Sequence, residues 1–184
     1  EYVIRKIVKD NLGKSFWHEK NGLRAVDKLD LLSDDKGSLT NLNLTYAVRD
    51  GIICHCGEVD ENGISPRNEN IDLNTIQNPG EVQPYTWEGC VVKISDKIAY
   101  LGRDIEDALL LKIISRDDLQ DIYKLGHQHV QKTINTSVII NELVSDLIEN
   151  SNVENGICFS KEKQNFINSI KKFNYEKIYD NKQF

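Results

Sequence analysis

Proline is confined to a single stretch of this chain. All three prolines, Pro66, Pro79 and Pro84, lie within residues 57–86. Because proline fixes φ and cannot donate a backbone hydrogen bond, the segments that lack it are the ones able to form long helices. The distribution therefore predicts helices on either side of one long irregular loop at about 57–86. A structureless loop of about 30 residues is more often a functional loop or lid than a passive connector.

Apolar residues recur at helical spacing outside that loop. The first predicted helix ends at Gly13. The second contains Leu23, Val26 and Leu29 and ends at the polar turn 34–37. The predicted helices cover residues 1–12, the run just described, about 44–57, 86–111, 117–132, 133–150 and 160–179. No internal repeat and no alternation of strands with helices is present. The predicted fold class is all-α.

The composition limits the classes of partner. The chain has 184 residues, with 23 basic and 29 acidic side chains and a formal charge of −6. This acidic balance argues against a nucleic-acid-binding surface. No apolar run reaches the roughly 20 residues of a membrane helix. Four cysteines without a CxxC pair indicate reduced thiols, so we expect a soluble, cytoplasmic protein without a membrane partner.

The ends of the sequence also carry predictions. The chain starts in what reads as mid-helix and contains no methionine, so we expect a fragment of a longer protein. Residues 151–156 have the composition of a linker. We therefore predict one domain portion over 1–150 and a helical appendage over 151–184, whose last helix is amphipathic and rich in lysine.

The most informative segment is the predicted helix at 86–111. At about 100° per residue, one face of roughly 120° gathers two acids, two bases and a tyrosine: Asp96, Lys97, Tyr100, Arg103 and Asp104. The opposite face is apolar and is the expected core contact: Ile94, Leu101, Ile105, Ala108 and Leu109. Such a polar face suits a metal ion and phosphate oxygens. The alternative is a solvated surface on which Arg103 pairs with Asp107.

Four ordered segments carry a family resemblance. They are residues 16–22, 43–52 and 85–92, followed by Asp96-Lys97-Ile98-Ala99-Tyr100 with Arg103-Asp104. Over about residues 14–110 they resemble the HD-domain deoxynucleoside triphosphate triphosphohydrolases, of the dGTPase-like kind, downstream of the His-Asp motif. The resemblance implies part of an HD-domain helical bundle. It also implies hydrolysis of a deoxynucleoside triphosphate to the deoxynucleoside and inorganic triphosphate, often by a homo-oligomer.

The same resemblance implies roles for individual residues. Asp96 would be a ligand of a divalent cation, such as Mg²⁺, Mn²⁺ or another transition metal. Lys97 and Tyr100 would contact the triphosphate, and Asp104 would act at its sugar or phosphate end. His18 would be catalytic, near the scissile phosphate, where an imidazole can protonate the departing 5′ oxygen. The alternative for His18 is an exposed histidine following an aromatic pair.

Other polar residues are expected to be structural. His55 lies between Cys54 and Cys56, a spacing that suits neither usual zinc geometry nor a helix face, so we expect packing. His127 and His129 are expected on the surface. The neighbours Arg49 and Asp50 are interpreted as stabilising a helix surface and are left out of the site.

The motif that names the HD family is absent from this chain. None of its four histidines is followed by aspartate. One carboxylate cannot hold a catalytic metal, because affinity needs several fixed ligands. The chain by itself is therefore expected to be inactive. Two hypotheses remain, a fragment of an active enzyme and a catalytically inactive HD-like module that binds nucleotides or regulates.

Overall fold

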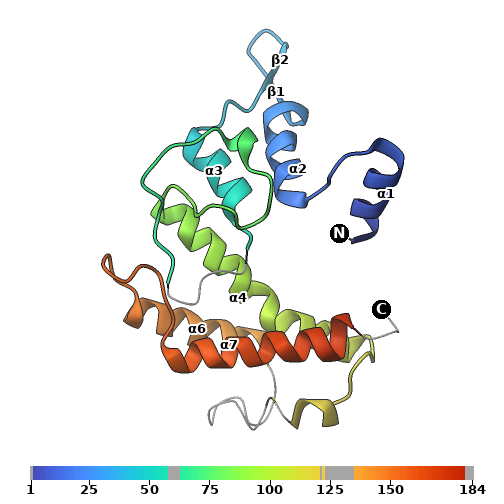
Figure 1. The fold of residues 1–184 in the computed structure, drawn as a ribbon, viewed down its shortest axis with the longest axis vertical. Helices are drawn as coiled ribbons and strands as arrows, with labels where there is room; N and C mark the ends of the chain where they lie inside the picture. The colour runs from blue at the N-terminus through green and yellow to red at the C-terminus, as the bar shows by residue number, and fades with distance from the viewer. Residues whose placement is uncertain (1, 58–62, 121, 123–134, 181–184) are drawn as a thin grey trace. The chain divides into compact units, whose positions relative to one another are not determined.

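The computed structural model describes residues 2–57, 63–120, 122 and 135–180. Two compact units divide the chain, Glu1–Val59 with Ser65–Lys93 and Asp60–Ile64 with Ile94–Phe184. The described residues are mostly helical, and their only sheet is a two-stranded antiparallel hairpin (Figure 1). The predicted all-α class is confirmed. None of the described helices is long and apolar enough to cross a membrane.

The first unit contains three of the predicted helices and the start of a fourth. They are α1 (Tyr2–Leu12), α2 (His18–Arg24), α3 (Tyr46–Cys54) and the beginning of α4 (Trp87–Leu110). Gly13 follows α1 with a positive φ of 61°, which confirms it as the stop. A π-helical turn, Ala25–Leu29, extends α2.

The hairpin was not predicted. Strands β1 (Leu31–Ser33) and β2 (Leu39–Asn41) pair on either side of the polar turn, so this turn closes a hairpin and does not end a helix. Its Asp34 carboxylate accepts hydrogen bonds from the backbone N–H groups of Lys36, at 2.9 Å, and Ser38, at 2.8 Å. Every residue of both strands is exposed, so the sequence has no alternation of apolar and polar residues to mark them.

The loop after α3 contributes to the core of the first unit. A short 3₁₀ turn, Leu73–Thr75, carries Leu73 inward, and Ile76 is buried beside it. These two side chains join a cluster from the helices and their flanks: Trp17, Leu23, Ile53 and Cys54. The segment lacks long elements, as predicted, yet it covers α2 and α3 with apolar side chains.

A buried ion pair ties this loop to α3. Asp50 is 1% exposed and accepts hydrogen bonds from the Arg67 guanidinium and, at 2.7 Å, from the Tyr85 backbone N–H. Arg67 also donates to the Tyr46 hydroxyl at 2.6 Å and to the Gln83 carbonyl at 2.7 Å. Because both charges are satisfied by partners, their burial is compatible with a stable fold.

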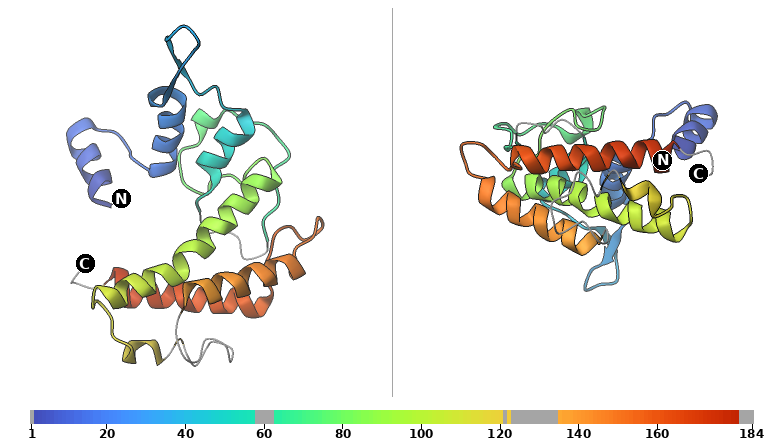
Figure 2. Two further views of the ribbon diagram at one scale, coloured as in Figure 1. Left: turned by 180° about the vertical axis from the view of Figure 1, so that it is seen from behind. Right: turned by 90° about the horizontal axis from the view of Figure 1, so that it is seen from below.

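The second unit holds the rest of α4 with α6 (Thr136–Asn150) and α7 (Lys161–Phe173), which continues as a π-helical turn, Asn174–Tyr179. Both helices run alongside the later part of α4 (Figure 2). Gly102 permits close packing there, since a Cβ would lie 3.1 Å from atoms of Ile139 and Thr136. Residues 152–156 form a turn, and the predicted helix 117–132 lies largely outside the described residues.

The apolar faces predicted for α4 and α7 are confirmed. On α4 the buried residues include Ile94, Leu101, Ile105 and Ala108, while Leu109 is half-buried. On α7 they are Phe166, Ile167, Ile170 and Phe173. The two compact units are divided within α4, between Lys93 and Ile94. The predicted boundary between residues 150 and 151 remains a prediction.

Candidate functional site

The polar face of α4 lies in the second unit. Asp96 is exposed, and Lys97, Tyr100 and Asp104 are half-buried. The helix runs without a break through all four positions, so their spacing places them on one side of it. The apolar residues of the opposite side are buried, which leaves this side as the outer one.

Asp104 and Arg103 of this face interact with other side chains of the chain. Asp104 accepts a hydrogen bond from the Tyr179 hydroxyl, at the end of the π-helical turn after α7. Burial, and then the Asp104 carboxylate, raise the pKa of Tyr179 above its ordinary value. Arg103 pairs with Asp107 one turn away, at 3.2 Å, and both side chains are well exposed. For Arg103, the solvated-surface interpretation therefore holds.

Asp96 does not belong to a set of three metal ligands among the described residues. One such set is found there, and its members are His18, His55 and Cys56 of the first unit. Among the described residues, the divalent cation implied by the resemblance therefore has Asp96 but no set of three potential ligands that includes it. A lone carboxylate does not fit a tightly held cation.

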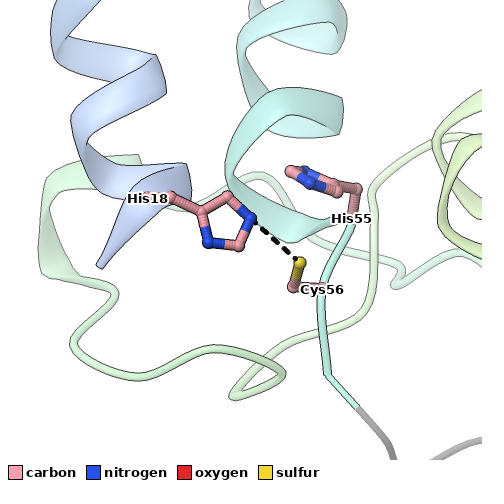
Figure 3. A group of neighbouring side chains, drawn as sticks. All are labelled: His18, His55 and Cys56. Carbon is pink, nitrogen blue, oxygen red and sulfur yellow. Dashed lines mark hydrogen bonds between the residues drawn. The ribbon is translucent and has the colours of Figure 1, made fainter. Parts of the chain in front are cut away.

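His18 is the first residue of α2, directly after the buried Trp17. Its side chain is 55% exposed. The ring Nδ1 lies 3.2 Å from Oε2 of Glu19, which is 2% exposed, and Nε2 lies 3.5 Å from Sγ of Cys56. The His55 ring stands edge-on to that of His18, with the centroids 5.7 Å apart (Figure 3). The histidine predicted to be catalytic is thus grouped with a second histidine and a thiol.

The end of α3 fixes the other two members of this group. His55 is the C-terminal cap of α3, and its Nδ1 lies 2.8 Å from the Ile52 carbonyl. Cys56 follows, and then Gly57, whose φ is 114°. A Cβ on Gly57 would lie 2.4 Å from the Cα of Gly80, so only glycine permits this close approach.

Cys54 and Cys56 differ sharply in their surroundings. Burial, and then the neighbouring Asp50 charge, raise the pKa of the Cys54 thiol to about 12. Cys54 is therefore an inert core residue. Cys56 is only half-buried and faces His18. The sequence predicted that His55 and the two cysteines beside it pack in the core, and this describes Cys54. His55 and Cys56, at the end of α3, instead lie close to His18 at the start of α2.

Several buried or paired charges were not identified from the sequence. Arg49 pairs with Asp27 and not with its neighbour Asp50, which is buried against Arg67. Lys93 is 1% exposed, and its ammonium donates to Oε1 of Gln83 at 3.1 Å. These partners lie 10 to 22 residues apart in sequence, beyond the reach of helical spacing rules. His127 and His129 lie outside the described residues.

The described fold is that of a mostly helical protein with ionisable side chains on α4 and at the start of α2. Among curated proteins, the chain is similar to the "Deoxyguanosinetriphosphate triphosphohydrolase-like protein" of Caldanaerobacter subterraneus subsp. tengcongensis, with 32% identity over 181 residues. The proteins of that name from Desulfatibacillum aliphaticivorans and Clostridium tetani are 29% and 28% identical. The match covers 97%, 94% and 95% of this chain, respectively.

These comparisons confirm the resemblance to dGTPase-like proteins, since relatives of that name match nearly the whole chain. The chain spans less than half of the relatives' length, 42%, 43% and 43% in the same order. No family model matches the chain.

Proposed function

We propose that this chain forms part of a metal-dependent deoxynucleoside triphosphate triphosphohydrolase. The reaction would convert the nucleotide to the deoxynucleoside and inorganic triphosphate. The observation that carries the proposal is similarity, over 94–97% of the chain, to the three proteins named above. Because the chain spans less than half of those proteins, the activity is proposed for an intact protein that contains it.

In this proposal the polar face of α4 meets the triphosphate. Lys97 would neutralise phosphate oxygens, Tyr100 would donate a hydrogen bond to them, and Asp104 would contact the sugar or phosphate end. Asp96 would give one ligand to a divalent cation whose other ligands come from outside this chain. That cation would polarise the phosphate and activate water.

His18 would hold and deliver a proton. An imidazole donates near neutral pH, and the departing 5′ oxygen needs a proton as its bond to phosphorus breaks. The exposure of the His18 ring supports this role, since a substrate can reach it. The Glu19 carboxylate beside Nδ1 would orient the ring.

The test is a product assay on the intact protein with each deoxynucleoside triphosphate and Mn²⁺ or Mg²⁺. Deoxynucleoside and triphosphate, resolved by chromatography and phosphorus NMR, are the expected products. Release of monophosphate and pyrophosphate would overturn the reaction. Asp96→Asn should reduce kcat by at least about 100-fold, whereas Asp117→Asn, a matched change in the 3₁₀ turn after α4, should leave it within about twofold.

A catalytically inactive HD-like module that binds or senses nucleotides is the second candidate. The observation that favours it is the lack of any histidine followed by aspartate among this chain's four histidines. Calorimetry separates the two candidates. Nucleotide affinity that is unchanged by Mn²⁺, together with no turnover by the intact protein, would favour the inactive module.

Three further expectations belong to this proposal. Residues 1–150 would be the later portion of the HD-type domain, with 151–184 as an appendage. The intact protein would form a homo-oligomer and act in the cytoplasm.

A further inference from the structure

We propose that His18, His55 and Cys56 bind one zinc-type transition-metal ion. This set of ligands does not include Asp96, and the inference does not rest on the proposed function. The potential ligand atoms of the three residues all lie within 4.8 Å of one another. They come from two helices of the first unit, the start of α2 and the end of α3, which pack against each other (Figure 3).

The spacing is close to that of a tetrahedral site. Zinc–nitrogen bonds of about 2.0 Å and zinc–sulfur bonds of about 2.3 Å place neighbouring ligand atoms roughly 3.3–3.6 Å apart. Nε2 of His18 and Sγ of Cys56 are already 3.5 Å apart. The ligand atom of His55 lies within 4.8 Å of both, so binding would require this atom to move closer to them.

Both imidazoles are held so that Nε2 is the coordinating atom. A carbonyl oxygen only accepts hydrogen bonds, so the 2.8 Å contact with Ile52 requires Nδ1 of His55 to carry the proton. The negative charge of Glu19, whose Oε2 lies 3.2 Å from Nδ1 of His18, favours a proton on that nitrogen without forming a hydrogen bond to it. In each ring Nε2 is then the nitrogen with a lone pair available to a metal, as in many zinc sites whose histidines are oriented by a carboxylate or carbonyl.

Glu19 supplies an independent observation. Its side chain is 2% exposed, and Oε2 has no hydrogen-bond partner among the described residues, although His18 Nδ1 lies 3.2 Å away. A buried carboxylate oxygen without a hydrogen bond is costly. A cation on the far side of the His18 ring would polarise Nδ1–H toward Glu19 and offset that cost. The burial of Glu19 beside His18 therefore supports the presence of a cation at this cluster.

The ligand set selects the class of metal. A thiolate with two imidazoles favours Zn²⁺ and Co²⁺ over Mg²⁺ and Ca²⁺, which prefer oxygen. Three protein ligands leave a fourth position for water, and the exposed His18 ring gives the ion a path of entry. Binding converts the Cys56 thiol to a thiolate and releases its proton to solvent.

Occupancy has a consequence for His18. Coordination uses the Nε2 lone pair, so a metal-bound His18 could not also take up and deliver a proton there. If the proposed function holds as well, zinc at this cluster would inhibit the reaction.

The experiment is a cobalt titration of the purified chain followed by absorbance. We expect one Co²⁺ per chain, with a thiolate-to-cobalt charge-transfer band in the near ultraviolet and intense visible bands of tetrahedral cobalt. Zn²⁺ should remove both sets of bands by displacement, and Mg²⁺ should not. This readout involves no nucleotide, so it is independent of the product assay and of Asp96.

Variants assign the bands to the cluster. Cys56→Ser should remove the charge-transfer band, whereas Cys158→Ser, a matched change at the other half-buried thiol, should retain it. Glu19→Gln keeps the shape of the side chain and should weaken Co²⁺ binding by about 10–100-fold, as expected for a group that orients a ligand. Circular dichroism of each variant checks the fold.

Two outcomes would overturn the inference. One is wild-type protein that binds no Co²⁺ with tetrahedral bands at micromolar concentrations. The other is a charge-transfer band that survives Cys56→Ser, or that disappears in Cys158→Ser. If Cys56→Ser fails to fold, His55→Gln and Glu19→Gln decide, because unchanged affinity in both also excludes the site.

Discussion

Arg49 donates two parallel hydrogen bonds to Asp27, from Nε to Oδ1 at 2.7 Å and from Nη2 to Oδ2 at 2.6 Å. The pair joins α3 to the π-helical turn after α2, within the first unit. Hydrogen bonding and attraction to the Arg49 guanidinium lower the pKa of the Asp27 carboxyl below its ordinary value of 3.8. This pair therefore links the stability of the unit to pH.

Replacing Asp27 by asparagine should lower the free energy of unfolding by about 1 kcal/mol at pH 7. Because the folded-state pKa is depressed, the contribution is present above the unfolded value of 3.8 and is lost as pH falls through the folded value. Urea unfolding at pH 7 and near pH 2 should show the two proteins converge in acid. Asp35→Asn, in the exposed hairpin turn, is the control and should show no such convergence. A difference that persists unchanged in acid would contradict the assignment.

Tyr179→Phe tests the contact with Asp104. Loss of the hydrogen bond should cost about 1 kcal/mol at neutral pH. Since the pKa of Tyr179 is raised above 10.0, the wild-type contribution is full below that value and declines as pH rises beyond it, when the unfolded state ionises first. Ultraviolet titration of tyrosinate in both proteins measures the shift. A Tyr179 that titrates at its ordinary pKa would show that the contact is not formed.

Arg67→Ala should destabilise the first unit by about 3–5 kcal/mol, because it leaves the buried Asp50 charge without its partner. The comparison is Arg103→Ala, which breaks the exposed pair with Asp107 and should cost less than about 1 kcal/mol. Chemical denaturation of both variants supplies the two values. Equal costs would mean that burial of Asp50 does not govern the stability of this pair.

Gly57→Ala should disturb the end of α3. The new Cβ would meet backbone atoms of Gly80, so we expect a loss of roughly 2 kcal/mol or more and a weaker cobalt site. Gly13→Ala is the matched control: its φ is also positive, but no atom lies within 4 Å of the added Cβ. It should cost about 1 kcal/mol and leave cobalt binding unchanged. Thermal unfolding and the cobalt titration together measure both effects.

The helices could be predicted because their information is local. The apolar side of α4 repeats every three or four residues, and burial of Ile94, Leu101 and Ile105 confirms it. Gly13 and the proline-rich stretch limit the helices for reasons of backbone geometry alone. The hairpin was missed because its strands, Leu31–Ser33 and Leu39–Asn41, bury nothing.

The candidate site shows the limit of local information. The polar face of α4 follows from helical spacing, but its Tyr179 partner lies 75 residues from Asp104. His18 and Cys56 are 38 residues apart, and nothing in the spacing of His55 and Cys56 alone points to His18. Only the packing of α2 on α3 brings them together. For the same reason, the sequence did not reveal that Asp50 pairs with Arg67, 17 residues away, and not with the adjacent Arg49.

The loop after α3 is irregular, yet it is anchored by Arg67 and by the buried side chains of Leu73 and Ile76. A protein engineer choosing where to insert a tag or a reporter peptide would do better at the exposed turn Asp34–Gly37 than in this longer segment. Proteases should follow the same order of preference over these two stretches. The loop after α3 thus contributes to the stability of the first unit although its backbone is irregular.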